Sequence, residues 1–325
     1  MKILWAKKGT KMIALNTVKG IIEISSWHDI VERPHFRSNI NPTNVDLKEI
    51  IGSYQFPEDV PCGLTTCHQP HKRGYIVVTK EGFETNIGKD CGKNYFSVDF
   101  VEMKTRFDRD VKTSLQRDNI RKAQETAPQL LEHVEGLRKQ PKGADWIYSR
   151  IEKLRNRGVI GEAAANEIRK MLKERRKELL SSRLATKEER ERDFSMDPSL
   201  EDKFHGQPYY ITIVTGSINH LEAMSKGNDL KEILIRSVIP TLRQLIDCNV
   251  DNLKSRELAQ LSKEASSIQA KIKMAQEIIP LAQKLLTAAN LEPLAFWVEE
   301  HHGERAAEPF KRFIEQLQDK LTLLQ

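Results

Sequence analysis

The sequence predicts a mainly α-helical protein with a small N-terminal α+β module, helical hairpins and a coiled-coil-like C-terminal bundle. Charged residues make up 30% of the chain and aromatic residues 6%, a balance that suits charged amphipathic helices better than a β-sandwich or a large α/β enzyme. Apolar residues recur at steps of three and four in several stretches after residue 96, as on one face of a helix. At 325 residues the chain is long enough for two or three folding units.

The α+β module is expected over residues 1–100. Residues 20–24 are β-prone, and two short helices are expected, one capped by Ser25 or Ser26 and one capped by Asn44 that continues through residues 47–51. Further on, the run GYIVVTKEGFETNIG at residues 74–88 predicts a β-hairpin, because β-branched residues alternate on both sides of a Glu-Gly turn.

Three cysteines and one histidine flank this hairpin at the spacing Cys62-x4-Cys67-x3-His71-x19-Cys91. Zinc prefers thiolate sulfur and imidazole nitrogen in a tetrahedron, so these four residues would complete its coordination shell. The first three ligands lie in one tight loop, and the hairpin returns the chain to deliver Cys91 at the start of a helix. Because no coordination position is left for water, the pattern predicts one structural Zn²⁺ ion and a zinc-binding module.

The order of loop, hairpin and helix resembles a treble clef, although the two Cys-x-x-Cys pairs of that fold are absent. His68 is the alternative fourth ligand. The resemblance also implies a rival function, a metal-dependent nuclease with His68 as general base. Basic residues near the ligands would offset the negative charge of the thiolates and are candidates for phosphate contacts. These are Lys72, Arg73, Lys89 and Lys93.

A basic helical region is expected over residues 101–185, with a break at residues 140–143 and a last helix that continues through Leu179. Its segment IEKLRNRGVIGEAAANEIRKMLKERRKELL resembles the SHOCT-type helical hairpin, which implies self-association. Residues 138–185 contain fourteen Lys and Arg against six Asp and Glu. Such a concentrated excess attracts a polyanion by releasing its counterions.

Residues 186–208 combine alternating charges with Pro, Gly and Asp, and predict a charged linker before a C-terminal region at residues 209–325. The strand expected at residues 209–214 is not stable alone, so we expect it to pair with the N-terminal β-elements in preference to another copy of the chain. A helical bundle should follow. Its a/d seam runs for three heptads through Leu258, Leu261, Ala265, Ile268, Ile272, Ala275 and Ile279. An antiparallel hairpin with residues 230–246 or with the final helix is favoured over a dimer zipper.

The leading functional hypothesis is a non-enzymatic, zinc-stabilised binding or assembly protein that engages nucleic acid, DNA or RNA, through its basic helices. The candidate contacts in those helices are Arg169, Lys170, Lys173, Arg175, Arg176 and Lys177. A protein-protein adaptor that oligomerises through its helices is the first alternative, and the nuclease is the second. Common catalytic signatures such as His-Glu-x-x-His and Gly-x-Ser-x-Gly are absent.

A cytoplasmic location without a membrane partner is expected. The sequence has no run of about 18 apolar residues, and the N-terminal run MKILWAKKGT becomes charged too early for a signal peptide.

Overall fold

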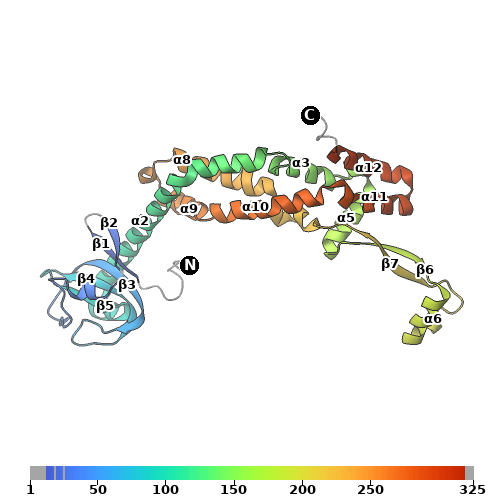
Figure 1. Ribbon diagram of the computed structural model, residues 1–325. Coiled ribbons are helices and arrows are strands. Elements are labelled where there is room, and N and C mark those ends of the chain that lie inside the picture. The colour runs from blue at the N-terminus through green and yellow to red at the C-terminus, as the bar shows by residue number, and fades with distance from the viewer. Residues whose placement is uncertain (1–11, 18–19, 25, 319–325) are drawn as a thin grey trace. The chain divides into compact units, whose positions relative to one another are not determined.

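The chain adopts a mostly helical structure with small antiparallel sheets, as the computed structural model in Figure 1 shows. Residues 12–17, 20–24 and 26–318 are described; the N-terminal run MKILWAKKGT and the expected cap residue Ser25 lie outside them. The chain divides into two compact units. Unit 1 comprises residues 1–122 and 248–263, and unit 2 comprises residues 123–247 and 264–325. The mainly helical fold class is therefore confirmed, while coiled-coil packing stays a prediction.

Unit 1 is built on a five-stranded antiparallel sheet in the order β2-β1-β3-β4-β5. Its strands are β1 (Met12–Thr17), β2 (Gly20–Ile24), β3 (Leu47–Val60), β4 (His71–Thr79) and β5 (Glu84–Gly88). Helix α1 (His28–Val31) is the first of the two short helices expected, and the β4–β5 hairpin is confirmed. Apolar side chains cover both faces of the sheet, because neighbouring residues of a strand point to opposite sides. Ile76 belongs to the core on one face, and Val77 to the core on the other.

The prediction of a second short helix at residues 47–51 is wrong. These residues open β3, which pairs with β1 on one side and with β4 on the other. Within residues 47–51 the pairing is with β4, through Leu47, Glu49 and Ile50, whereas β1 pairs with β3 from Gly52 onward. The ladder to β4 satisfies backbone groups that a helix would have paired locally, so tertiary context overrides the local pattern.

Helix α2 (Lys89–Lys139) follows the hairpin directly and changes direction at Ser97, where φ is 46°. The apolar spacing predicts one helical face through Phe96, Phe100, Met103, Phe107, Val111 and Leu115. Phe100, Phe107 and Val111 are buried in the core beneath the sheet, whereas Leu115 is 42% exposed, so the amphipathic pattern is confirmed as far as Val111. Unit 1 also contains η4 (Val250–Asn252) and most of α9 (Ser255–Ala265). Asn119 of α2 donates to the carbonyl of Ser262 in α9 over 2.9 Å.

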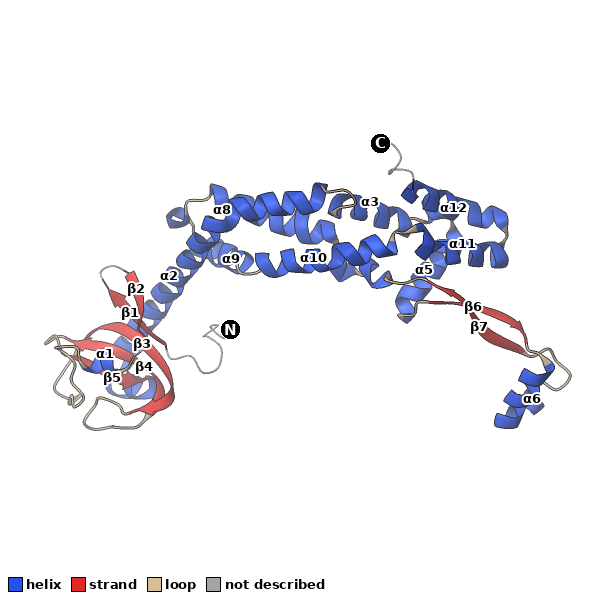
Figure 2. Ribbon diagram, in the orientation of Figure 1, coloured by secondary structure: helices blue, strands red, loops and turns tan. Residues whose placement is uncertain are grey.

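Unit 2 contains the remaining helices (Figure 2). Its buried core is mostly aliphatic and includes Phe310 and Phe313. After the expected break, α3 (Ala144–Arg155), α4 (Arg157–Ile160) and α5 (Glu162–Glu174) follow in succession. The later elements are η1 (Leu221–Met224), η2 (Lys226–Asn228), the π-helix η3 (Lys231–Val238), α8 (Ile239–Asp247), α10 (Ile268–Leu285), α11 (Ala288–His302) and α12 (Glu304–Gln318).

The expected seam from Leu258 to Ile279 is interrupted, because α9 ends at Ala265 and α10 begins at Ile268. The antiparallel pairing with residues 230–246 is present. Lys271 donates to the hydroxyl of Ser237 over 2.7 Å, and the hydroxyl of Thr241 donates to Glu264 over 3.4 Å. The residue number increases along one segment while that of its partner decreases, so the two segments run antiparallel.

A hairpin of β6 (Glu178–Leu184) and β7 (Tyr210–Ser217) extends from the helices of unit 2 (Figure 2). Two predictions are corrected here. The third helix does not continue through Leu179, because Arg175 adopts a left-handed conformation that ends α5. The strand near residue 210 pairs with β6, which the sequence had assigned to that helix, and not with the N-terminal strands.

The segment at residues 186–208 is more structured than the charged linker expected there. It forms α6 (Lys187–Met196), which Thr186 caps, and α7 (Ser199–Lys203). Tyr209 packs between Phe194 and Phe204, with ring centroids 5.2 Å from each. These contacts fold the segment onto itself at the far end of the β6–β7 hairpin.

Candidate functional site

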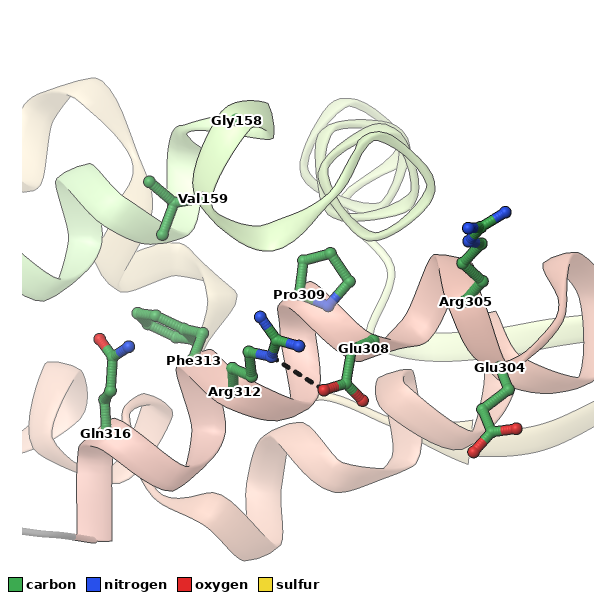
Figure 3. A pocket seen from close by; sticks show the side chains of 9 residues that line it. All are labelled: Gly158, Val159, Glu304, Arg305, Glu308, Pro309, Arg312, Phe313 and Gln316. Carbon is green, nitrogen blue, oxygen red and sulfur yellow. Dashed lines mark hydrogen bonds and ion pairs between the residues drawn. The ribbon is translucent and has the colours of Figure 1, made fainter.

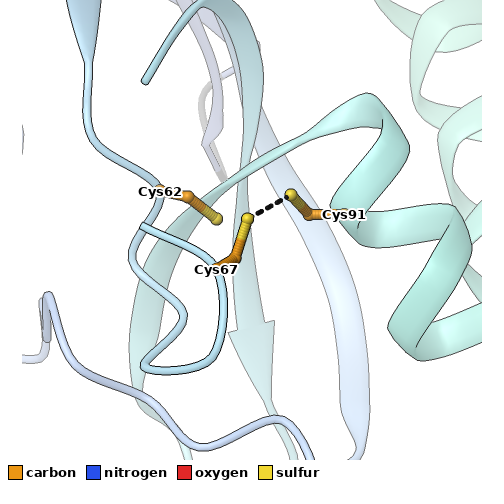
Figure 4. A group of neighbouring side chains, drawn as sticks. All are labelled: Cys62, Cys67 and Cys91. Carbon is orange, nitrogen blue, oxygen red and sulfur yellow. Dashed lines mark hydrogen bonds between the residues drawn. The ribbon is translucent and has the colours of Figure 1, made fainter. Parts of the chain in front are cut away.

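Three of the four predicted metal ligands meet in unit 1. The Sγ atoms of Cys62, Cys67 and Cys91 all lie within 4.8 Å of one another, and those of Cys67 and Cys91 are 2.9 Å apart (Figure 4). Cys62 and Cys67 come from the loop between β3 and β4, and Cys91 from the first turn of α2. Among the described residues this is the one group of three or more His, Cys, Asp and Glu side chains with such spacing.

The loop is held against the hairpin by backbone hydrogen bonds. Gly63 donates its N–H to the carbonyl of Asn86 over 2.8 Å, and a Cβ at this position would lie 2.1 Å from the hydroxyl of Thr85. Only glycine permits this close approach. The amide N–H of Cys67 donates to the carbonyl of Leu64 over 3.1 Å, which closes the turn that brings Cys67 towards Cys62.

The cluster fits a tetrahedral thiophilic ion. With Zn–S bonds of about 2.3 Å, the sulfur atoms of such a site lie about 3.8 Å apart, within the range seen here. Burial raises the pKa of the Cys62 thiol, and burial together with the hydrogen bond that the Cys91 thiol donates to Cys67 raises the pKa of Cys91 to about 12. Without a cation, the thiols of Cys62 and Cys91 therefore stay protonated. The pKa of Cys67 is lowered, because its partial burial is outweighed by hydrogen bonds from Cys91, the backbone of Gln69 and Cys62. A bound metal would displace the protons and hold all three as thiolates.

His71, the predicted fourth ligand, does not join the group. Its Nε2 atom lies 2.5 Å from the hydroxyl of Tyr54, and its Nδ1 atom lies 3.0 Å from the carbonyl of Gln69. The four-ligand set predicted from spacing is therefore incomplete in this arrangement, because the side chain of His71 is directed to a buried tyrosine instead. Tyr54 also accepts a hydrogen bond from Asn86 over 3.1 Å. The hydrogen bonds among His71, Tyr54 and Asn86 could not be predicted from the spacing of residues in the sequence.

His68, the alternative ligand and the candidate general base of a nuclease, also lies outside the group. Its backbone is left-handed, with φ of 48°, and its Nδ1 atom lies 3.3 Å from the carbonyl of Cys62. A histidine that binds a metal commonly uses one ring nitrogen for the ion and donates the other to a carbonyl. The contact with Cys62 is compatible with that role.

The basic candidates near the cluster are exposed. Lys72 and Arg73 lie at the start of β4, and Lys89 and Lys93 lie in the first turns of α2. They are placed on two elements that flank the cysteines in sequence, so they can offset thiolate charge through solvent.

The basic candidates of unit 2 divide into two kinds. Arg169, Lys170 and Lys173 are exposed on α5, opposite the buried Ile168 and Met171, and Arg175 and Lys177 are exposed just beyond its end. Arg176 differs from these five. Its side chain is only 12% exposed and lies 2.6 Å from both Glu167 and Glu174. It also donates to the carbonyl of Glu178. Arg176 therefore holds the end of α5 in place.

Two surface cavities of unit 2 are lined by charged side chains. One, of about 790 Å³, lies between α4 and α12 (Figure 3). Its lining includes Glu304 and Glu308 against Arg305 and Arg312, and Arg312 donates to Glu308 over 2.8 Å. These charges balance, so this cavity does not favour an anion. The other, of about 760 Å³, lies at the end of α5 and includes the run from Arg175 to Lys177.

The chain matches no protein-family model, no curated protein and no solved structure. The treble-clef and SHOCT resemblances therefore depend on sequence pattern and geometry alone. Within the described part of the chain, no helix has the length and apolar character needed to cross a bilayer.

Proposed function

We propose that this protein is a non-enzymatic nucleic-acid-binding protein whose N-terminal module is stabilised by one zinc ion. The observation that carries the binding role is the exposed basic face of α5, formed by Arg169, Lys170 and Lys173. Residues three and four apart are neighbours on a helix, so these three cations form one continuous patch.

This patch has the properties of a phosphate-binding surface. Its side chains are long, exposed and free to follow a backbone, while the opposite face of α5 buries Ala164, Ala165 and Ile168 in the core of unit 2. Each phosphate that is neutralised releases counterions, and the logarithm of the binding constant then falls by about 0.9 per contact for each tenfold rise in salt. Three to five contacts predict micromolar binding that weakens steeply between about 50 and 200 mM salt.

The zinc ion has a structural role in this proposal. Cys62, Cys67 and Cys91 would hold it, and a histidine of the same loop would complete the shell. Such an ion contributes on the order of 10 kcal/mol to folding, more than the core of a small module supplies.

The decisive experiment measures retention of labelled single- and double-stranded oligonucleotides at several salt concentrations. Reversing the charges at Arg169, Lys170 and Lys173 to Glu should abolish binding at about 100 mM salt, because three attractive contacts become repulsive. The matched control reverses three exposed lysines elsewhere in unit 2, Lys187, Lys273 and Lys284, and should retain most of the affinity. Equal losses of oligonucleotide affinity in both variants would show that binding depends on the net charge of the protein and not on this patch. Absence of binding by the native chain at low salt would refute the proposal.

A second candidate, a protein-protein adaptor, is favoured by one face of the β6–β7 hairpin. The strand register places Leu184 opposite Tyr210 and Leu180 opposite Val214, with Ser182 and Thr212 between them. None of these six side chains is charged, and Leu184, Tyr210 and Val214 are 57%, 60% and 62% exposed. An apolar, uncharged sheet face is typical of protein interfaces. Light scattering of the native chain and of a Leu184→Ser, Val214→Thr variant would show whether this face drives self-association.

A further inference from the structure

The groove at the end of α5 has two walls that come from separate parts of unit 2. One wall is the run Arg175, Arg176 and Lys177, where α5 ends and β6 begins. The other lining segment follows β7 and includes Asn219, His220 and Ser225. The groove has a volume of about 760 Å³ and is also lined by apolar side chains such as Met171 and Leu221.

Both walls contain a residue in a conformation that favours glycine. Arg175 has φ of 55° and ψ of 33°, at the position after a helix where glycine is the usual residue. His220 has φ of 63° and ψ of 23°. A left-handed backbone is unfavourable for residues with a Cβ, and such residues cluster at functional sites. Two of them, each with a cationic or titratable side chain, line one groove.

Arg176 fixes the geometry between these walls. Its guanidinium is tied to Glu167 and Glu174 on α5 and to the carbonyl of Glu178 on β6. This clamp holds Arg175 and Lys177, the residues on either side, at the groove lining without using their own side chains. The groove thus presents the exposed cations Arg175 and Lys177 on a rigid support. On the helix face of α5, Arg169 donates to the side chain of Asn166 over 2.9 Å.

The cations of the groove that can meet a ligand are Arg175 and Lys177, which are exposed and whose side chains make no ion pair within the described part of the chain. Arg176 does not add to them, because Glu167 and Glu174 neutralise its charge. The lining carboxylates are Glu178 and Glu222, and Glu222 lies 3.6 Å from Nδ1 of His220. His220 and the amide of Asn219 add hydrogen-bonding groups on the other lining segment. Cationic and hydrogen-bonding groups that converge from two sides are suited to the oxygens of a phosphate.

We propose that this groove is the principal phosphate-binding site of the protein and takes a phosphate of the nucleic-acid backbone between Arg175, Lys177 and His220. The proposal depends on the proposed nucleic-acid-binding function, and it assigns the tightest contact to the groove and the weaker, additive contacts to the face of α5.

The test uses Arg175→Gly and His220→Gly in the full-length protein. Glycine removes the side chain and relieves the left-handed backbone, so the melting temperature should be unchanged or higher while oligonucleotide affinity falls at least fivefold for Arg175→Gly and at least twofold for His220→Gly. Lys142→Gly is the matched control, because Lys142 is an exposed basic residue with φ of 53° outside the groove. It should change affinity less than twofold.

A second measurement is a titration with inorganic pyrophosphate followed by amide chemical shifts, which should move at Arg175, Lys177 and His220. Native-like binding by both glycine variants, with binding lost in the helix-face variant, would overturn the groove assignment and leave the proposed function intact. Pyrophosphate shifts spread over the surface would also overturn it. If the native chain binds pyrophosphate in the groove but no oligonucleotide, the nucleic-acid function fails and the assignment of a nucleic-acid phosphate fails with it.

Discussion

The cysteine cluster of unit 1 and the basic end of α5 in unit 2 are assembled in opposite ways. The cluster joins Cys67 to Cys91, 24 residues away, across a hairpin, and the sulfur atoms meet only when the sheet is formed. The basic face of α5 needs little more than a helix, because its cations are neighbours in sequence. This difference teaches that loss of the metal should damage structure, whereas loss of the basic residues should damage binding and leave structure intact.

Removal of zinc should have the largest effect and should be confined to unit 1. A chelator, or Cys62→Ser, is expected to destabilise the β1–β5 sheet by on the order of 10 kcal/mol, because the three clustered thiols would lose the zinc ion that we propose they bind. Amide hydrogen exchange would show lost protection in β3–β5 and retained protection in α10–α12. Cys248→Ser, outside the cluster, is the control. Stoichiometric metal content near zero in freshly purified native protein would contradict the structural role.

Arg176→Ala should have the next largest effect, and on the stability of unit 2. It leaves the buried carboxylate of Glu167, whose side chain is 8% exposed, without its partner, which typically costs about 3–5 kcal/mol. Arg169→Ala, an exposed residue of the same helix, should change stability by less than about 0.5 kcal/mol. Thermal unfolding of the two variants distinguishes Arg176, which supports the fold, from Arg169, which we propose contacts nucleic acid. Equal stabilities would show that Arg176 is not a clamp.

The fourth metal ligand can be identified with His68→Ala and His71→Ala. Both ring nitrogens of His71 are already engaged, whereas His68 has a contact between Nδ1 and the carbonyl of Cys62. We therefore expect His68→Ala to weaken zinc binding about 10–100-fold and His71→Ala to leave it within about threefold. Cobalt substitution reports the change, because its visible spectrum depends on the ligand set. The reverse order of affinities would restore His71 as the ligand.

The smallest effect concerns α6, where the pKa of Glu189 is lowered to about 2 by hydrogen bonds from Arg183 and the backbone of Thr186. A lowered carboxyl pKa means that the stabilisation is present above the ordinary value of 4.5 and is lost as pH falls towards 2. Carboxyl titration by NMR should show this midpoint. Glu189→Gln should increase amide exchange in α6 at neutral pH, while Glu191→Gln, at an exposed position, should not.

Much of the helical part was predictable because its signals are local. The break after Lys139 and the buried face of Ile147 and Leu154 follow from apolar spacing and from breakers such as Pro141 and Gly143. For α10 the sequence left two antiparallel partners open, and the structure selects residues 230–246. The β4–β5 hairpin likewise follows from alternation around a turn. The errors occur where pairing is non-local. Residues 47–51 and Leu179 have helix-like spacing, yet both lie in strands whose partners are far away in sequence.

The sequence by itself determined which residue types are available: a cluster of thiols at a metal-ligand spacing and a concentrated excess of cations near α5. Only the tertiary structure decided which of them act together. It directs His71 to Tyr54, buries Arg176 beside Glu167, and places His220 and Arg175 in the lining of one groove. The physical reason is that spacing along the chain limits which residues can come close together, whereas the direction of a side chain depends on backbone torsions and on neighbours from distant parts of the sequence.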